Sequence, residues 1–287
     1  MDGAWVDERV YYTKELAVHG GLRSSALLRA FSAVPRERFL PPGPWILEAS
    51  DGSYYSTEDD DVGHVLHAVG VAIDVTRHLN SANPATVGRT LEAAKIEGGD
   101  TILHVGAGLG YFSAVMAEMV GPSGRVIAAE VDPDLRAQAR ANLAPWTNVE
   151  VVGDALTCPL PPLDVVFSSA GVADVPQGWV KALRPGGRMI LPITGSLDGG
   201  FLFRFERAAE MSWLSAEARS FVRFFPCQGA RSIGQLTALD KAIADPRANL
   251  VRHLRLDHHE FESQCWLHND DWCLSTRDSP HEGADQF

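Results

Sequence analysis

The chain has 287 residues, 45% of them hydrophobic and 22% charged, which is the composition of a globular protein with a packed core. Its 37 acidic side chains outnumber its 25 basic ones, and the resulting net charge of -12 repels phosphate backbones and argues against a nucleic-acid substrate. No apolar segment reaches membrane-spanning length, and the N-terminus lacks the basic and then apolar order of a signal peptide, so we expect a cytoplasmic protein with no membrane partner.

The first region, residues 1–79, is expected to form an N-terminal helical cap that takes part in substrate binding. Ser24 or Ser25 is placed to cap a helix, because a hydroxyl can accept a hydrogen bond from the first free backbone amides. Apolar residues follow at helical spacing: Leu27, Leu28, Phe31 and Val34. The acidic run at 58–61 is interpreted as a solvated loop, with a site for a cation or a basic peptide as the alternative.

The second region, residues 80–208, alternates strand-like and helical segments. Asn83 followed by Pro84 predicts a helix start, because proline is favoured at the first helical position. The elements predicted next are a strand at 100–105, a helix at 111–120, a strand at 125–129, a helix at 134–143, strands at 149–152 and 164–167, a short helix at 179–183, a tight turn at 185–187 and a strand at 189–193. Apolar strands that alternate with helices indicate a Rossmann-like α/β fold, with a parallel sheet covered by helices on both faces.

The last region, residues 209–287, is expected to be a C-terminal extension of the core. Just before it, residues 201–206 alternate like a late antiparallel strand; further on, 221–225 is a candidate strand and 233–243 a helix, and the residues after 275 are polar and expected to fray. We expect the four cysteines to be reduced thiols. The C-terminal stretch holds a cluster of ligand-type residues: His258, His259, Cys265, His268 and Cys273. The close paired spacing of structural zinc ligands is not evident there, so no metal site is expected.

The feature that carries chemistry is the glycine loop at 104–110, His-Val-Gly-Ala-Gly-Leu-Gly, between a predicted strand and a predicted helix. Glycines permit a sharp turn and let the backbone approach a bound cofactor without a Cβ in the way. The Gly-x-Gly-x-Gly spacing favours a nucleoside-methionine cofactor over a dinucleotide. A plain glycine turn is the alternative.

Two carboxylates support this interpretation, since each follows the end of a predicted strand, where open α/β sheets bind ligands. Glu130 is placed to accept hydrogen bonds from both hydroxyls of a ribose, and Asp154 to reach an adenine amino group. An ordinary helix-capping role before Pro133 is the alternative for Glu130. Together with the loop, these residues indicate S-adenosylmethionine. The candidate cofactor-binding residues are His104, Gly106, Ala107, Gly108, Gly110, Tyr111, Glu130, Asp154 and Ala155.

Several segments occur in an order that resembles the protein-L-isoaspartate O-methyltransferase family: Val34 to Pro41, Leu79 to Pro84, His104 to Tyr111 and Leu183 to Arg188. The resemblance covers about residues 25–208. It implies a seven-stranded methyltransferase sheet and methyl esterification of an isoaspartyl or aspartyl carboxylate in a protein or peptide. It also implies that Gly106, Gly108, Glu130 and Asp154 contact the cofactor.

The chain departs from the family at the acceptor segment and at His104. The family carries Ser or Thr two residues before the proline, where this chain has Ala82, so Asn80 and Ser81 become the candidate catalytic residues that hold the acceptor. His104 stands where Asp or Glu is usual; it either forms a hydrogen bond near the methionine end of the cofactor or packs within its strand. A small-molecule carboxylate or hydroxyl acceptor, or a non-catalytic protein that binds S-adenosylmethionine, are the alternative functions, and the oligomeric state is left open.

Overall fold

The computed structural model describes residues 3–49, 53–208 and 213–278. These residues form two compact units, the first made of 3–49, 53–100 and 107–153 and the second of 101–106, 154–208 and 213–278. These units divide the chain differently from the three regions of the sequence, and the region boundaries stay a prediction. No helix in the described ranges has the length and apolar character to span a membrane.

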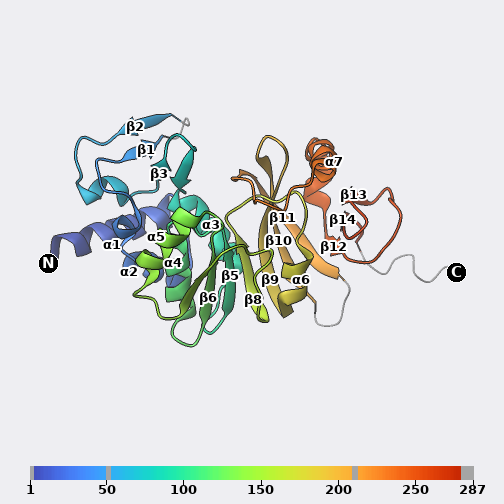
Figure 1. Ribbon diagram of the computed structural model, residues 1–287, viewed down its shortest axis with the longest axis horizontal. Coiled ribbons are helices and arrows are strands. Elements are labelled where there is room, and N and C mark those ends of the chain that lie inside the picture. Colours follow the sequence, from blue (N-terminus) through green and yellow to red (C-terminus); the bar gives the residue numbers. More distant parts are fainter. Residues whose placement is uncertain (1–2, 50–52, 209–212, 279–287) are drawn as a thin grey trace. The chain divides into compact units, whose positions relative to one another are not determined.

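The first unit contains an antiparallel sheet, a pair of parallel strands and the helices around them (Figure 1). Its elements are α1 (Gly3–Val18), α2 (Ser25–Ala33), β1 (Ile46–Glu48), β2 (Tyr54–Ser56), β3 (Gly70–Asp74), β4 (Leu79–Ser81), α3 (Pro84–Ala94), α4 (Tyr111–Val120), β6 (Arg125–Ala129), α5 (Pro133–Leu143) and β7 (Val149–Val152), with short 3-10 helices at Arg36–Phe39 and Val62–Val65. The antiparallel sheet has the order β2-β1-β3-β4 and packs on Trp45, Leu47, Val65 and Val71.

Local capping explains where the predicted helices of this unit begin. The Ser24 hydroxyl accepts a hydrogen bond from the Leu27 amide at 3.2 Å, which confirms the predicted cap of α2. Asn83 caps α3 with Pro84 as its first residue, also as predicted. The bounds of α4, β6 and β7 match the sequence prediction, β6 pairs with β7 in parallel, and α4 packs on β6 while α5 packs on β7.

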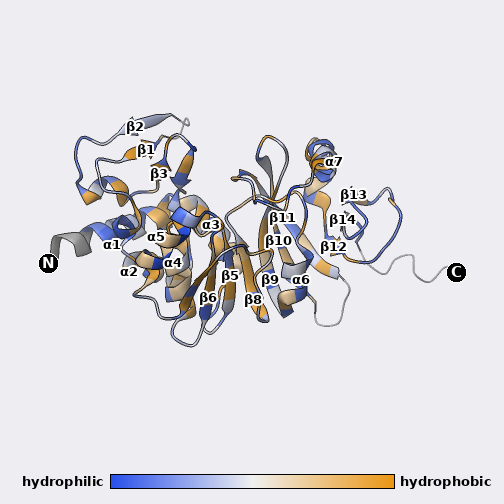
Figure 2. Ribbon diagram, viewed as in Figure 1, coloured by the Kyte–Doolittle hydropathy of each residue, from blue (hydrophilic) through white to orange (hydrophobic). Residues whose placement is uncertain are grey.

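The second unit is built on one mixed sheet. Its elements are β5 (Thr101–Val105), β8 (Leu163–Ser168), α6 (Gln177–Ala182), β9 (Leu183–Thr194), β10 (Gly199–Arg207), β11 (Trp213–Arg223), α7 (Ile233–Ile243), a 3-10 helix at Pro246–Leu250, β12 (His253–Arg255), β13 (Cys265–His268) and β14 (Cys273–Ser275). Among these strands the order is β5-β8-β9-β10-β11-β12-β14-β13, parallel from β5 to β9 and antiparallel beyond. β5 and β8 are strongly hydrophobic (Figure 2), because both faces of these strands are covered.

The mixed α/β class is confirmed, with differences in detail. The predicted number of seven core strands is not confirmed, because the second unit has eight strands in its described part and three of them, β12, β13 and β14, lie in the predicted C-terminal extension. The turn predicted at 185–187 lies inside β9, where Gly186 has a φ of 76° and four residues oppose a single residue of β8. The strand predicted at 221–225 is the end of the longer β11, while the helix at 233–243 has the predicted bounds. Residues 279–287, most of the tail expected to fray, lie outside the described residues.

Candidate cofactor site

The glycine loop enters α4 through three glycines in the left-handed region. Gly106, Gly108 and Gly110 have φ values of 75°, 55° and 97°, a conformation that disfavours other residues. A Cβ on Gly110 would lie 2.8 Å from Leu143 Cδ1, so this glycine is required by packing. A Cβ on Gly108 would meet no atom within 4 Å. The loop therefore has open space directly beside its central glycine.

Glu130 follows β6 and is tied to the same loop. Its Oε2 accepts a hydrogen bond from the Gly108 amide at 2.8 Å, and its Oε1 accepts one from the Asp132 amide at 3.0 Å. The residue is only 7% exposed, and burial raises the pKa of its carboxyl above the usual value while the two amides counteract part of that rise. Two backbone donors thus orient the carboxylate and leave one lone-pair direction on each oxygen for a ligand.

The helix after Glu130 is capped by another residue. The Asp132 carboxylate accepts hydrogen bonds from the Asp134 and Leu135 amides at 2.9 and 3.0 Å, which makes it the N-cap of α5. The alternative in which Glu130 is merely a helix-capping acid is therefore wrong. Its carboxylate joins two segments, since Oε2 accepts from the Gly108 amide of the glycine loop and Oε1 from the Asp132 amide.

Asp154 and Ala155 belong to the second unit, in the turn that follows Gly153. The Asp154 carboxylate accepts a hydrogen bond from the Leu156 amide at 2.8 Å, which holds the turn. Ala155 is buried, and its carbonyl accepts a hydrogen bond from the indole of Trp179 at 2.9 Å. A fixed carboxylate and a fixed small residue are suited to the edge of an adenine ring, although the contact itself stays a prediction.

His104 is a packed residue of β5. It is 1% exposed, its Nε2 lies 3.0 Å from the Ser169 hydroxyl, and its ring meets Phe167 edge-on at a centroid distance of 5.7 Å. Burial lowers the pKa of the imidazole to about 3, so the ring is neutral at physiological pH. Of the two roles that the sequence left open for His104, packing within its strand is therefore observed, and a contact with the cofactor stays a prediction.

Tyr111 directs its side chain into an aromatic cluster of the first unit. Its hydroxyl lies 3.0 Å from that of Tyr12, and its ring packs near Phe31, Phe39 and Phe112. The ring is 3% exposed. A cofactor contact of Tyr111, like that of its neighbours Ala107 and Gly110, would therefore come from the backbone.

The candidate acceptor residues lie on β4, the last strand of the antiparallel sheet. Asn80 donates a hydrogen bond from Nδ2 to Glu48 Oε2 at 3.0 Å. The Ser81 hydroxyl is half-buried and has no hydrogen-bond partner among the described residues. Ser81 is thus available to a ligand through its hydroxyl, whereas the amide nitrogen of Asn80 is engaged.

One residue that supports the first unit was not singled out from the sequence. Arg36 is fully buried and donates hydrogen bonds to the carbonyls of Val65, His67 and Val69 at 2.7 to 2.9 Å. Its guanidinium also lies 5.9 Å from the Tyr111 ring centroid. It connects the 65–69 loop to the residue that opens α4. Its neighbours Glu37 and Arg38 are charged as well, so the sequence held no signal that singled out Arg36.

These features fit a nucleoside cofactor bearing a ribose. The loop supplies a close backbone approach, and Glu130 is oriented to accept from hydroxyl groups. Within the first unit the structure joins Gly108 to Glu130 directly, whereas Asn80 and Ser81 lie on a separate sheet.

Comparison with known proteins gives the family. A model of the protein-L-isoaspartate(D-aspartate) O-methyltransferases matches residues 11–232. The chain is 31% identical over 185 residues to the protein-L-isoaspartate O-methyltransferase of Ignicoccus hospitalis, covering 63% of this chain and 79% of the relative. It is 34% identical over 193 residues to that of Aeropyrum pernix, covering 65% and 67%.

A solved structure agrees with these relatives. A protein-L-isoaspartate O-methyltransferase superposes with a TM-score of 0.66 at 25% identity, over 87% of this chain and 72% of that one. The predicted S-adenosylmethionine-dependent methyltransferase is thereby confirmed as a class of enzyme. The chain belongs to the protein-L-isoaspartate(D-aspartate) O-methyltransferase family.

Proposed function

We propose that this enzyme methylates a carboxylate of an isoaspartyl or aspartyl residue in a protein or peptide. The family match over residues 11–232 supports the reaction class. The single structural observation that carries the proposal is the hydrogen bond between the Gly108 amide and Glu130, beside the open space at Gly108. We assign Gly106, Gly108, Glu130 and Asp154 to the S-adenosylmethionine site on this basis.

The chemistry asks little of the chain beyond binding and alignment. Bound S-adenosylmethionine supplies a methyl group that its positively charged sulfur makes electrophilic. A carboxylic acid has a reference pKa of about 4, so the acceptor is ionised at neutral pH and needs no general base. The protein contributes by holding the carboxylate in line and by excluding water.

We assign the acceptor carboxylate to the segment that joins β4 to α3. The Ser81 hydroxyl can donate a hydrogen bond to it, and the positive end of the α3 dipole begins three residues later at Pro84. Asn80, whose amide nitrogen is bonded to Glu48, then acts by holding the strand rather than the acceptor.

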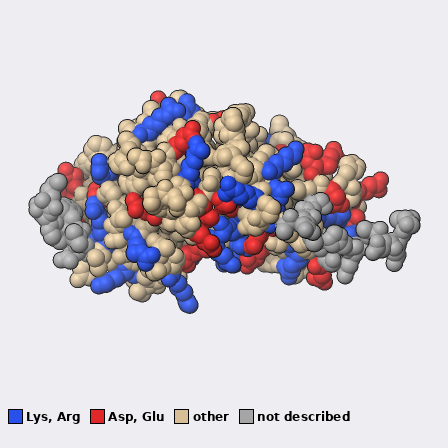
Figure 3. Space-filling model, turned by 90° about the horizontal axis from the view of Figure 1, so that it is seen from below, with Lys and Arg blue, Asp and Glu red and all other residues tan. Residues whose placement is uncertain are grey.

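A small-molecule carboxylate or hydroxyl is the second candidate acceptor. It is favoured by Ala82 at the position where the family carries Ser or Thr. A protein acceptor is favoured over nucleic acid by the net charge of -12. On the face shown in Figure 3, basic side chains are interspersed with acidic ones and form no continuous basic surface. We also propose a cytoplasmic location, supported by the four cysteines, which are all in the reduced state.

The deciding experiment incubates the full chain with methyl-labelled S-adenosylmethionine and an isoaspartyl peptide. We expect label in the peptide that is released as methanol by mild base, as a methyl ester requires. Label that appears only with an added mixture of small acids or hydroxyl compounds would favour the second candidate. Binding of S-adenosylmethionine without transfer to either would leave only a binding protein and reject both.

The cofactor assignment is tested with Glu130→Gln. Glutamine has one acceptor oxygen where glutamate has two, so one of the hydrogen bonds that we assign to the ribose hydroxyls is lost and the other loses its charge. We therefore expect the affinity for S-adenosylmethionine, measured by calorimetry, to fall about 10- to 100-fold. Glu150→Gln is the matched control, because Glu150 is half exposed on β7, away from the glycine loop, and pairs with Arg125. Equal affinities of the two variants would contradict the assignment.

The acceptor assignment is tested with Ser81→Ala. We expect the KM for the acceptor to rise about 5- to 10-fold, the loss of roughly one hydrogen bond, with the affinity for S-adenosylmethionine unchanged. Ser56→Ala removes an exposed hydroxyl from β2 in the same sheet and serves as the control. An unchanged KM in both variants would place the acceptor elsewhere.

A further inference from the structure

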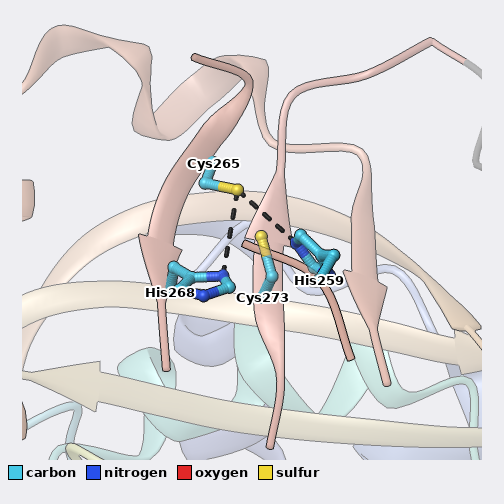
Figure 4. A group of neighbouring side chains, drawn as sticks. All are labelled: His259, Cys265, His268 and Cys273. Atoms are coloured by element: carbon cyan, nitrogen blue, oxygen red, sulfur yellow. Dashed lines mark hydrogen bonds between the residues drawn. The ribbon is translucent and has the colours of Figure 1, made fainter. Parts of the chain in front are cut away.

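Four ligand-type side chains of the second unit converge near the C-terminal end of the described chain (Figure 4). His259 lies in the loop before β13, Cys265 and His268 lie on β13, and Cys273 begins β14. Their ligand atoms all lie within 4.8 Å of one another. We call these four residues the Cys2His2 cluster.

An irregularity in β13 brings the cluster together. On a regular strand, Cys265 and His268 are three residues apart and would point to opposite faces of the sheet. Here Cys265 opposes Ser275 and Leu267 opposes Leu274, so β13 contains one residue more than β14 over this stretch. The bulge turns Cys265 to the face that His268 shares with its cross-strand partner Cys273.

The distances fit a tetrahedral metal ion. The Cys265 sulfur lies 3.6 Å from His259 Nε2 and 3.9 Å from His268 Nδ1. Zinc bound at about 2.3 Å from sulfur and about 2.0 Å from nitrogen in a tetrahedron places such atoms about 3.5 Å apart. These two distances are therefore close to those of a zinc coordination sphere, and the largest separation in the cluster, 4.8 Å, has to shorten when an ion binds.

The surroundings orient the ligand atoms as they do around metals. His259 Nδ1 lies 2.9 Å from the Asp257 carbonyl oxygen; in the tautomer that donates this hydrogen bond, Nε2 carries a lone pair facing the cluster. The Glu262 amide donates to the Cys265 sulfur at 3.4 Å, which favours a thiolate. Cys265 and Cys273 are 1% and 0% exposed, so their sulfurs are shielded from solvent.

Ion pairs hold the loop that carries His259. Arg255 on β12 pairs with Asp257 at 2.5 Å, and its guanidinium also lies 3.6 Å from Glu262. Arg277, just after β14, pairs with Glu262 as well. The loop from 256 to 264 is thus fastened at both ends to the strands beside it, and the position of His259 is set before any ion binds.

We propose that the Cys2His2 cluster binds one Zn²⁺ ion in a structural site. Two sulfurs and two imidazole nitrogens are a ligand set that selects zinc over Mg²⁺ or Ca²⁺, which prefer oxygen. Four protein ligands close the coordination sphere, so the ion stabilises β13, β14 and the preceding loop and leaves no position for a substrate. This departs from the expectation of no metal, because the Cys-x-x-His pair at 265–268 is the close spacing that was thought to be missing.

The first test measures zinc in the full chain, purified under a thiol reductant and without chelator. We expect one equivalent of zinc per chain by elemental analysis, or one equivalent taken up when the chelated protein is titrated with Zn²⁺. A chain that binds no zinc at stoichiometric addition overturns the proposal. So does a Cys265–Cys273 disulfide found by mass spectrometry in reductant-treated, zinc-free protein. The readout is independent of methyl transfer, so failure here leaves the proposed enzymatic function untouched.

The second test assigns the ligands. Cys265→Ser with Cys273→Ser should weaken Zn²⁺ binding at least about 100-fold in competition with a chromophoric chelator. His258→Ala and Cys158→Ser are the matched controls, an exposed histidine next to His259 and a cysteine outside the cluster, and should retain the wild-type affinity. Co²⁺ should give thiolate charge-transfer and tetrahedral d–d absorption in the wild type and both controls only. Wild-type zinc affinity in the double cysteine variant would overturn the assignment.

Discussion

The parallel and antiparallel parts of the sheet in the second unit are stabilised in different ways. β5, β8 and the end of β9 are runs of consecutive buried residues, as expected of strands covered on both faces. β11 instead alternates buried and exposed residues, and β12, β14 and β13 have only three or four residues each. Strands this short gain little from backbone pairing alone. The antiparallel part therefore depends on particular side chains to hold it in place.

Trp266 gives the largest expected effect on this comparison. The residue is 4% exposed, and its indole packs on Phe201 and Phe203 of β10, with ring-centroid distances of 6.0 and 5.8 Å. These contacts join β13 to the middle of the sheet. Trp266→Ala should lower the free energy of unfolding by about 3–5 kcal/mol, measured by urea denaturation followed by circular dichroism.

The control for this variant is Ile233→Ala, which removes an apolar side chain that is 84% exposed at the start of α7. Its unfolding free energy should stay within about 0.5 kcal/mol of the wild type. If Trp266→Ala were as stable as this control, the antiparallel strands would not depend on the contacts of Trp266, which would contradict the proposed contrast with β5 and β8.

In the first unit, Arg36 has a role comparable to that of Trp266, because its side chain holds the irregular segment at 65–69 in place. Arg36→Met would leave three carbonyls in the 65–69 loop without their donor, so we expect a loss of about 2–4 kcal/mol in unfolding free energy. Arg38→Met alters an exposed arginine two residues away and should cost less than about 0.5 kcal/mol. Thermal or urea denaturation distinguishes them, and equal stabilities would show that the loop does not need the guanidinium.

His104 tests the parallel part through the pH dependence of stability, an effect that develops only as the pH falls below the usual histidine pKa. Its folded pKa of about 3 lies below the usual 6.5, so the unfolded chain binds more protons between these values. The free energy of unfolding should therefore rise with pH across this window, by up to about 1.4 kcal/mol per pH unit from His104. This contribution of His104 to stability is lost as the pH falls toward 3. His104→Gln should flatten the dependence, and Ser169→Ala, which keeps the imidazole, should retain it. Identical profiles for His104→Gln and the wild type would show that the imidazole is not buried in its neutral form.

The elements that could be predicted from the sequence are those fixed by local signals. The helix at 111–120 and the strands at 125–129 and 149–152 have the predicted bounds, because apolar periodicity and the flanking glycines and Asp132 mark their ends. β12, β13 and β14 were missed, since strands of three or four residues show no period and form only through pairing with distant segments.

In the candidate site, too, the residue types could be predicted from local signals, whereas the contacts between distant segments could not. The glycine loop and Glu130 could be selected from spacing, but the hydrogen bond that joins Gly108 to Glu130 could not, because it connects residues 22 positions apart. The Cys2His2 cluster was dismissed for a related reason. Its residues were judged by their spacing along the chain, while their proximity comes from the pairing of β13 with β14.

The bulge in β13 makes the Cys2His2 cluster a matter of residue count as well as residue type. Because Cys265 and His268 are three residues apart, loss of the bulge without a change of sequence would send their side chains to opposite faces of the strand. Deletion of one residue between them would instead leave a spacing of two, which keeps both side chains on one face of a regular ladder. In related chains, the spacing of cysteine and histidine therefore indicates a metal site only when it is judged together with the register of the strand that carries them.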